Sequence, residues 1–205
     1  MQIDFREREA AIRLVELLIS NGICKALSQK TMEDLYEEVL CNLGFGFNNG
    51  LTKGCFWHSN LSGWVIKIGY NHHVCKDYAR TEYETYKAAV AQNLEYYFPF
   101  TDLLYEFEGV EFFIQERAEC SEDAITSDWY EKLLTYHEEN GDDLECYDIW
   151  DEVYDMRDSD KIELMFNDWA LCSFLSERKI GDFHEGNFGY IGDRTVIIDF
   201  SGYAG

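Results

Sequence analysis

The sequence predicts an α+β fold of two lobes, and three observations carry this prediction. Apolar residues recur at helical spacing over residues 5–27 and 30–42. Short apolar runs separated by Gly and Asn turns fill residues 43–70 and 101–116, as expected for strands. The helical pattern then returns from 126 to 179. We therefore expect helices, a five-stranded antiparallel sheet interrupted by one helix, more helices and a closing hairpin.

Two helices are expected before the sheet. In the first, Ala11, Leu14, Leu17 and Leu18 share one face, and the helix ends near Gly22. The second is opened by Thr31, a residue type that caps helix N-termini. Together they form an N-terminal helical extension over residues 1–42, followed by a sheet lobe and a reduced helical lobe over residues 43–118 and 119–205.

The sheet lobe is expected to hold three strands, one helix and then two strands joined by a Glu108-Gly109 turn. The second lobe ends in a hairpin with a Gly192-Asp193 turn. The expected ranges are 43–48, 54–58 and 63–69 for the first strands, 77–95 for the helix, 101–107 and 110–116 for the next strands, and 188–191 and 195–199 for the hairpin.

Composition and charge limit the classes of function. The chain has 205 residues, of which 46% are hydrophobic and 16% aromatic, which is enough for a packed core. Seven cysteines without a CxxC motif, a charged N-terminus and no apolar run of about 18 residues predict a cytoplasmic protein with reduced thiols. The net charge of -23 disfavours nucleic-acid and membrane partners.

Residues 121–163 concentrate this charge, with 16 acidic and 3 basic side chains. A solvated helical face explains such a stretch, and a docking surface for a basic protein partner is the functional alternative. The His72-His73-x-Cys75 cluster does not predict a zinc site, because no fourth ligand accompanies it.

The residues with the clearest chemistry lie near the C-terminus. Asp182 and Asn187 stand five residues apart, and Asp199 follows the apolar run Val196-Ile197-Ile198. Phosphoryl transfer needs a carboxylate beside the attacking hydroxyl and oxygen ligands for magnesium, and a loop followed by a hairpin can bring these three groups to one point.

This stretch resembles the protein-kinase-like superfamily, and most closely its aminoglycoside-phosphotransferase and choline-kinase branch. The D-x-H-x-x-N loop of that branch stands here at Asp182, His184 and Asn187, and its I-D-F-G-like loop stands at 198–201. The resemblance implies ATP and Mg²⁺ as cofactors, Asp182 as catalytic base, and Asn187 and Asp199 as metal ligands. The sequence departs from the family pattern at Ile180 and Ser201.

The same resemblance extends to the sheet lobe. Lys67 lies in an apolar strand that resembles the family's V-A-I-K strand, and a buried lysine needs an anionic partner. The resemblance implies that ATP phosphates and a helix carboxylate supply it. Glu82 is preferred because Tyr86, Ala89 and Val90 share its helix face, and Glu84 is the alternative.

The remaining nucleotide contacts are expected from two segments. The turn 49–54 would cover the phosphates through Gly50, Thr52, Lys53 and Gly54, with Gly44-Phe45-Gly46 as an alternative register. The strand 111–118 resembles the one that enters a kinase hinge, where the backbone of Glu116 and Ala118 would bond the adenine edge and Gln115 would occupy the gatekeeper position.

We therefore expect a minimal kinase-like phosphotransferase of unknown acceptor, because only six residues follow Asp199 where the resemblance implies a further helical region. Two alternatives stay open: a pseudokinase that binds nucleotide without transfer, and an acidic interaction protein, including a mimic of nucleic-acid charge.

Overall fold

The computed structural model describes residues 3–50, 52–70, 78–120, 168–180 and 187–201. The chain divides into two compact units. The first combines Met1–Ala88 with Phe100–Arg117, and the second combines Ala89–Pro99 with Ala118–Gly205. Across the described helices, no segment is both long and apolar enough for a membrane span.

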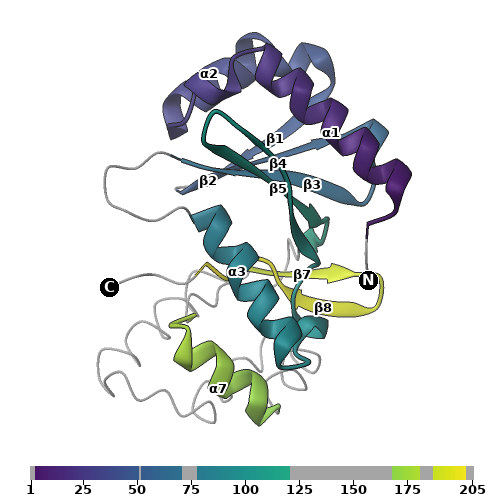
Figure 1. Ribbon diagram of the computed structural model, residues 1–205, viewed down its shortest axis with the longest axis vertical. Helices are drawn as coiled ribbons and strands as arrows, with labels where there is room; N and C mark the ends of the chain where they lie inside the picture. The colour runs from purple at the N-terminus through teal and green to yellow at the C-terminus, as the bar shows by residue number, and fades with distance from the viewer. Residues whose placement is uncertain (1–2, 51, 71–77, 121–167, 181–186, 202–205) are drawn as a thin grey trace. The chain divides into compact units, whose positions relative to one another are not determined.

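The predicted five-stranded antiparallel sheet is confirmed and lies in the first unit (Figure 1). Its strand order is β1-β2-β3-β5-β4, so the third strand lies at the centre of the sheet. The bounds are Phe45–Asn49 for β1, Lys53–His58 for β2, Trp64–Gly69 for β3, Thr101–Phe107 for β4 and Val110–Glu116 for β5.

The β4–β5 hairpin follows the predicted ranges residue for residue. Its two turn residues, Glu108 and Gly109, have φ angles of 51° and 79°. Two consecutive positive φ angles belong to the type I′ turn, whose twist matches that of paired strands. The local turn chemistry therefore sets the register of this hairpin, in which Phe107 pairs with Val110.

Helices α1 (Phe5–Ser20) and α2 (Gln29–Glu38) lie on the same side of the sheet (Figure 1). The first ends near Gly22 as expected, whereas the second ends at Glu38, before the expected residue 42. The first stops before Gly22, whose φ of 93° ends the helical path. The second is capped by Ser28 and not by Thr31, because Thr31 lies inside the helix and completes a capping box with Ser28.

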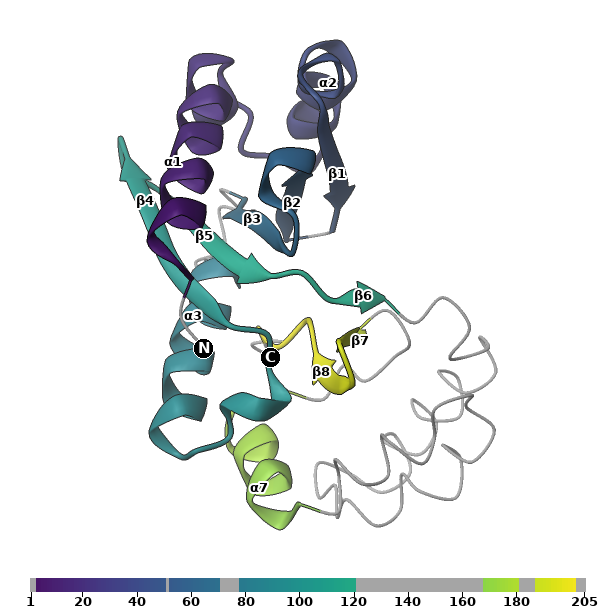
Figure 2. The ribbon, with the colours of Figure 1, turned by 90° about the vertical axis from the view of Figure 1, so that its right-hand side faces the viewer.

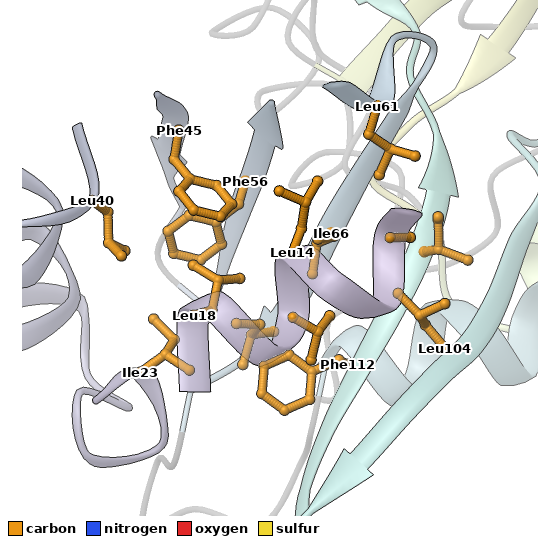
Figure 3. Close-up of a cluster of buried hydrophobic side chains, with 14 of the residues drawn as sticks. Leu14, Leu18, Ile23, Leu40, Phe45, Phe56, Leu61, Ile66, Leu104 and Phe112 are labelled. Carbon is orange, nitrogen blue, oxygen red and sulfur yellow. The ribbon is translucent and has the colours of Figure 1, made fainter. Parts of the chain in front are cut away.

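A hydrophobic core lies between these helices and one face of the sheet (Figure 3). Leu14 and Leu18 of α1 point toward Phe56 of β2 and Phe112 of β5, all at 7% exposure or less. Arg8 attaches the start of α1 to β4, along which the helix runs in Figure 2, by donating to Asp102 at 2.8 Å and to the carbonyl of Leu103 at 2.9 Å.

Helix α3 (Tyr78–Ala91) covers the opposite face of the sheet. Alternation along β3 separates the two faces, since Ile66 joins the core beneath α1 and Lys67 points the other way. The ring of Tyr83 on α3 lies 5.6 Å from the ring of Phe113, which pairs with Lys67 across β3 and β5. The central strand is therefore buried on both sides.

The second unit contains a three-stranded sheet and helix α7 (Trp169–Glu177). Strands β7 (Phe188–Ile191) and β8 (Arg194–Ile197) form the predicted hairpin. Strand β6 (Glu119–Cys120) pairs with β7 and was not predicted, because the helical lobe was expected to begin at residue 119. A strand of two residues is too short to show an alternation of apolar and polar side chains, so the sequence gives no signal for it. Its pairing with β7 alone defines it as a strand.

Tyr97 anchors the cap of α7 within the second unit. Its hydroxyl donates to Asp168 at 2.7 Å, and Asp168 in turn accepts from the backbone of Ala170 at 2.9 Å. Burial, followed by this hydrogen bond and the charge of Asp168, raises the pKa of Tyr97 to about 12. In the folded unit the phenol of Tyr97 therefore stays neutral to a higher pH than a free phenol does.

Tyr97→Phe is expected to lower the free energy of unfolding by about 1–2 kcal/mol near neutral pH, because the charged Asp168 loses a donor. A folded-state pKa above the unfolded one stabilises below pH ~10, and that contribution disappears as the pH rises toward 12. Urea unfolding at pH 8 and across pH 10–12 tests this. Between about pH 10 and 12, the free energy of unfolding should decline less in Tyr97→Phe than in the wild type. Tyr96→Phe should behave as wild type.

Candidate functional site

Lys67 and Glu82 form a buried ion pair between the central strand and α3. The Lys67 ammonium lies 2.8 Å from Glu82 Oε2. The exposed fractions are 6% for Lys67 and 0% for Glu82. A lysine in an apolar strand needs such a partner to offset the loss of its hydration.

A second lysine reaches the same carboxylate. Lys53, the first residue of β2, places its ammonium 2.7 Å from Glu82 Oε1. Lys53 pairs with Gly69 and Cys55 pairs with Lys67, so the two lysines are diagonal neighbours on one sheet face. The expectation placed Lys53 over phosphates in a turn, whereas the structure places its side chain in a buried cluster with Lys67 and Glu82. We call these three residues the two-lysine cluster.

The geometry of the two-lysine cluster makes Glu82 its electrostatic centre. Two unit charges about 4 Å apart interact by about 4 kcal/mol at an effective dielectric of ~20. Glu82 attracts both ammonium groups, while the ammonium groups repel each other. The formal charge of the three groups is +1, in a chain whose net charge is -23. These three groups therefore place two positive charges and one negative charge on one face of the sheet.

Glu84, the alternative partner for Lys67, lies on the exposed side of α3. It accepts from Arg80 at 3.2 Å, one turn earlier on the same helix. Arg80 also pairs with Glu111, whose hydrogen bond and charge raise the pKa of the guanidinium. The described contacts thus join Lys67 to Glu82 and Arg80 to Glu84.

The expected phosphate-covering turn over residues 49–54 is shorter than predicted. Asn49 closes β1 and pairs with Gly54 inside β2, so the connection is residues 50–52. A Cβ atom on Gly54 would lie 2.3 Å from the sulfur of Met32, a buried residue of α2. Close packing beneath α2, and not a turn, therefore requires this glycine. The alternative register fails as a turn as well, because Phe45 and Gly46 lie within β1.

Gly54→Ala is expected to cost about 1–3 kcal/mol of stability, because the added methyl group overpacks a filled core around Met32. Gly50→Ala is the matched control. Its Cβ would have one neighbour, the carbonyl oxygen of Lys53 at 3.3 Å, and its cost should stay near 0.5 kcal/mol. Equal losses in a urea titration would contradict the packing role of Gly54.

The segment expected to bond adenine is the end of β5. Gln115 is buried and donates from its amide to Thr101 Oγ1 at 3.0 Å. The backbone N–H of Glu116 donates to Phe100 at 2.9 Å, and the Glu116 carboxylate accepts from the backbone of Phe100 at 3.3 Å. These contacts hold the end of β5 beside the start of β4. Ala118 is half-buried and begins the next stretch of the second unit.

In the second unit, the β7–β8 hairpin brings Asn187 next to the segment that carries Asp199. The backbone N–H of Ile198 donates to the carbonyl of Asn187 at 2.8 Å. The fully buried Phe200 anchors the chain just after Asp199. Ser201 donates its hydroxyl to Asp199 Oδ1 at 3.0 Å. This serine therefore orients the carboxylate.

The oxygen atoms that Asn187 and Asp199 can offer are of the chemical type that binds magnesium. An amide oxygen from Asn187 and a carboxylate from Asp199 are hard oxygen ligands, and Mg²⁺ is commonly bound by one or two carboxylates together with substrate phosphates. Among the described residues, no group of three His, Cys, Asp or Glu side chains gathers. Asp182, His72, His73, Cys75 and the acidic stretch 121–163 lie outside the described residues.

Sequence reasoning missed the position of Lys53 and the role of Ser201. A signal for Lys53 was available, because Lys53, Cys55 and Trp57 alternate along a strand that is next to the strand of Lys67. Comparison of the chain with protein-family models, with curated proteins and with solved structures finds no match.

Proposed function

We propose that the protein is an ATP- and Mg²⁺-dependent phosphotransferase with a kinase-like fold and an acceptor still to be identified. The observation that carries the proposal is the buried pair between Lys67 and Glu82, at 2.8 Å. A strand lysine held by a helix carboxylate is the arrangement that positions ATP phosphates in protein kinases.

The proposed roles follow from the chemistry of each group. Lys67 binds the phosphates and Glu82 positions its ammonium. Asp182 accepts the proton of the acceptor hydroxyl, whose oxygen forms a new bond to the γ-phosphorus while the bond to the ADP oxygen breaks. Asn187 and Asp199 hold magnesium. When bound, the metal neutralises charge on the transferring phosphoryl group.

Thermal unfolding with Mg-ATP tests nucleotide binding. A ligand that binds the folded state at 100 times its Kd stabilises by about 2.7 kcal/mol, which raises the melting temperature. We expect this shift in the wild type and a smaller one in Lys67→Met. The absence of any shift at millimolar Mg-ATP, in protein shown to be folded, would contradict the proposal.

Release of ADP tests transfer, with water as the default acceptor. Turnover should disappear in Asp182→Ala and Asp199→Ala. It should persist in Glu84→Gln, because the wild-type Glu84 carboxylate pairs with Arg80 on the exposed side of α3. Turnover retained in both alanine variants would reject the assigned roles. A wild type that binds Mg-ATP without turnover would support the pseudokinase instead.

A further inference from the structure

We propose that Lys53 is a second phosphate-binding residue, and that Lys53 and Lys67 together select ligands carrying two or more linked phosphates. This inference rests on the proposed function for its nucleotide and deepens it by naming the phosphate class. The observation behind it is the two-lysine cluster, in which one carboxylate receives an ammonium on each oxygen, at 2.7 and 2.8 Å.

The shared carboxylate limits the distance between the two ammonium groups. They cannot lie farther apart than one carboxylate and its two hydrogen bonds span. Adjacent phosphoryl groups of a polyphosphate are separated by one bridging oxygen, so two neighbouring cations match a linked pair better than a single phosphate. An ammonium binds phosphate as a compact point charge.

Both lysines also stand on rigid backbone. Lys67 lies on the central strand, hydrogen-bonded to a strand on each side. Lys53 starts β2, where its carbonyl accepts from Gly50 at 3.2 Å, and the carbonyl of Thr52 accepts from Tyr70 at 3.0 Å. A binding residue on a fixed strand loses little freedom when the ligand arrives, which favours affinity.

The described contacts join both lysines to Glu82. Gathering a second ammonium at the same carboxylate brings two like charges together, which is unfavourable in a buried setting. A polyphosphate that contacts both groups reverses this unfavourable term. The arrangement is therefore one that favours a multiply charged anion over a monoanion.

Isothermal titration with inorganic tripolyphosphate, pyrophosphate and phosphate tests the inference. The wild type should bind tripolyphosphate more tightly than pyrophosphate, and single phosphate weakly. Lys53→Met should weaken tripolyphosphate binding about ten- to hundred-fold, the loss of one charge-assisted hydrogen bond. Lys53→Arg, which keeps the charge, should retain most of the affinity. Lys87→Met removes an exposed lysine of α3 and should bind as wild type.

A second measurement uses the wild-type protein, in case Lys53→Met does not fold. In ¹³C-labelled protein, the Cε resonances of Lys53 and Lys67 should both shift when tripolyphosphate is added. A shift confined to Lys67, or unchanged affinity in folded Lys53→Met, would overturn the inference.

The outcomes separate this inference from the proposed function. Tripolyphosphate binding that needs Lys53, in a protein without ATP turnover, would keep the inference and remove the phosphotransferase. ATP turnover that is unchanged in Lys53→Met would keep the phosphotransferase and remove the inference.

Discussion

Glu82→Gln is expected to lower the free energy of unfolding by about 3–5 kcal/mol, the cost of breaking a buried ion pair by removing one partner. The loss should be large because this carboxylate is fully buried and serves two lysines, at 2.7 and 2.8 Å. Neutralising it leaves two ammonium groups close together without the carboxylate that attracts both of them. Urea unfolding followed by tryptophan fluorescence measures the change.

Three further variants make this prediction specific. Glu84→Gln removes an exposed carboxylate from the same helix and should change stability by about 0.5 kcal/mol or less. Lys67→Met should cost less than Glu82→Gln, because Glu82 keeps its contact with Lys53. Adding Lys53→Met to Glu82→Gln should recover part of the loss, since one of the two repelling charges is removed. If Glu82→Gln is as stable as Glu84→Gln, the electrostatic role of Glu82 is wrong.

Phe98→Ala is expected to cost about 3–5 kcal/mol, the usual range for removing a buried phenylalanine ring. Phe98 is fully buried in the second unit. Its ring centroid lies 5.7 Å from that of Phe174 on α7 and 5.0 Å from that of Phe200. Deleting the ring leaves a cavity between the helix and the segment that follows β8. Thermal and urea unfolding should both report the loss.

The effect of Phe98→Ala should extend to the Asp199 segment. Phe200 directly follows Asp199, so loosening its packing should broaden the backbone amide resonances of residues 198–201 in an NMR spectrum. Trp169→Ala is the matched control, because this aromatic residue of α7 is 66% exposed and its removal leaves no comparable cavity. Equal destabilisation by both substitutions would contradict a core role for Phe98.

Much of the fold could be predicted wherever short-range patterns decide the structure. The β4–β5 hairpin matches its prediction because Glu108-Gly109 supplies the turn conformation locally. Predictions of individual elements were wrong where a residue outside the segment under consideration determines the structure. Thr31 looks like a cap in isolation, yet Ser28 takes that position by forming a capping box with it. Strand β6 exists through pairing with β7, which comes much later in the chain.

The candidate site shows the same division. The resemblance of the Lys67 strand to a kinase strand pointed to Lys67, and helix-face reasoning pointed to Glu82; the structure places the two in contact. Gly54 was interpreted as a phosphate-binding glycine, but its neighbour is Met32 from a helix on the opposite face of the sheet from Lys67. No spacing in the sequence encodes that approach, because it depends on how α2 packs on the sheet.

By itself, then, the sequence determined most of the described elements, the antiparallel hairpins and the identity of the residues that carry charge, since these follow from backbone propensity and from alternation over a few positions. Tertiary structure alone decided that Lys53 joins Lys67 at Glu82 and that Ser201 bonds to Asp199. The physical reason is that a buried charge takes its partner from whichever segment the packing brings within hydrogen-bond distance, and that distance is a property of the folded chain.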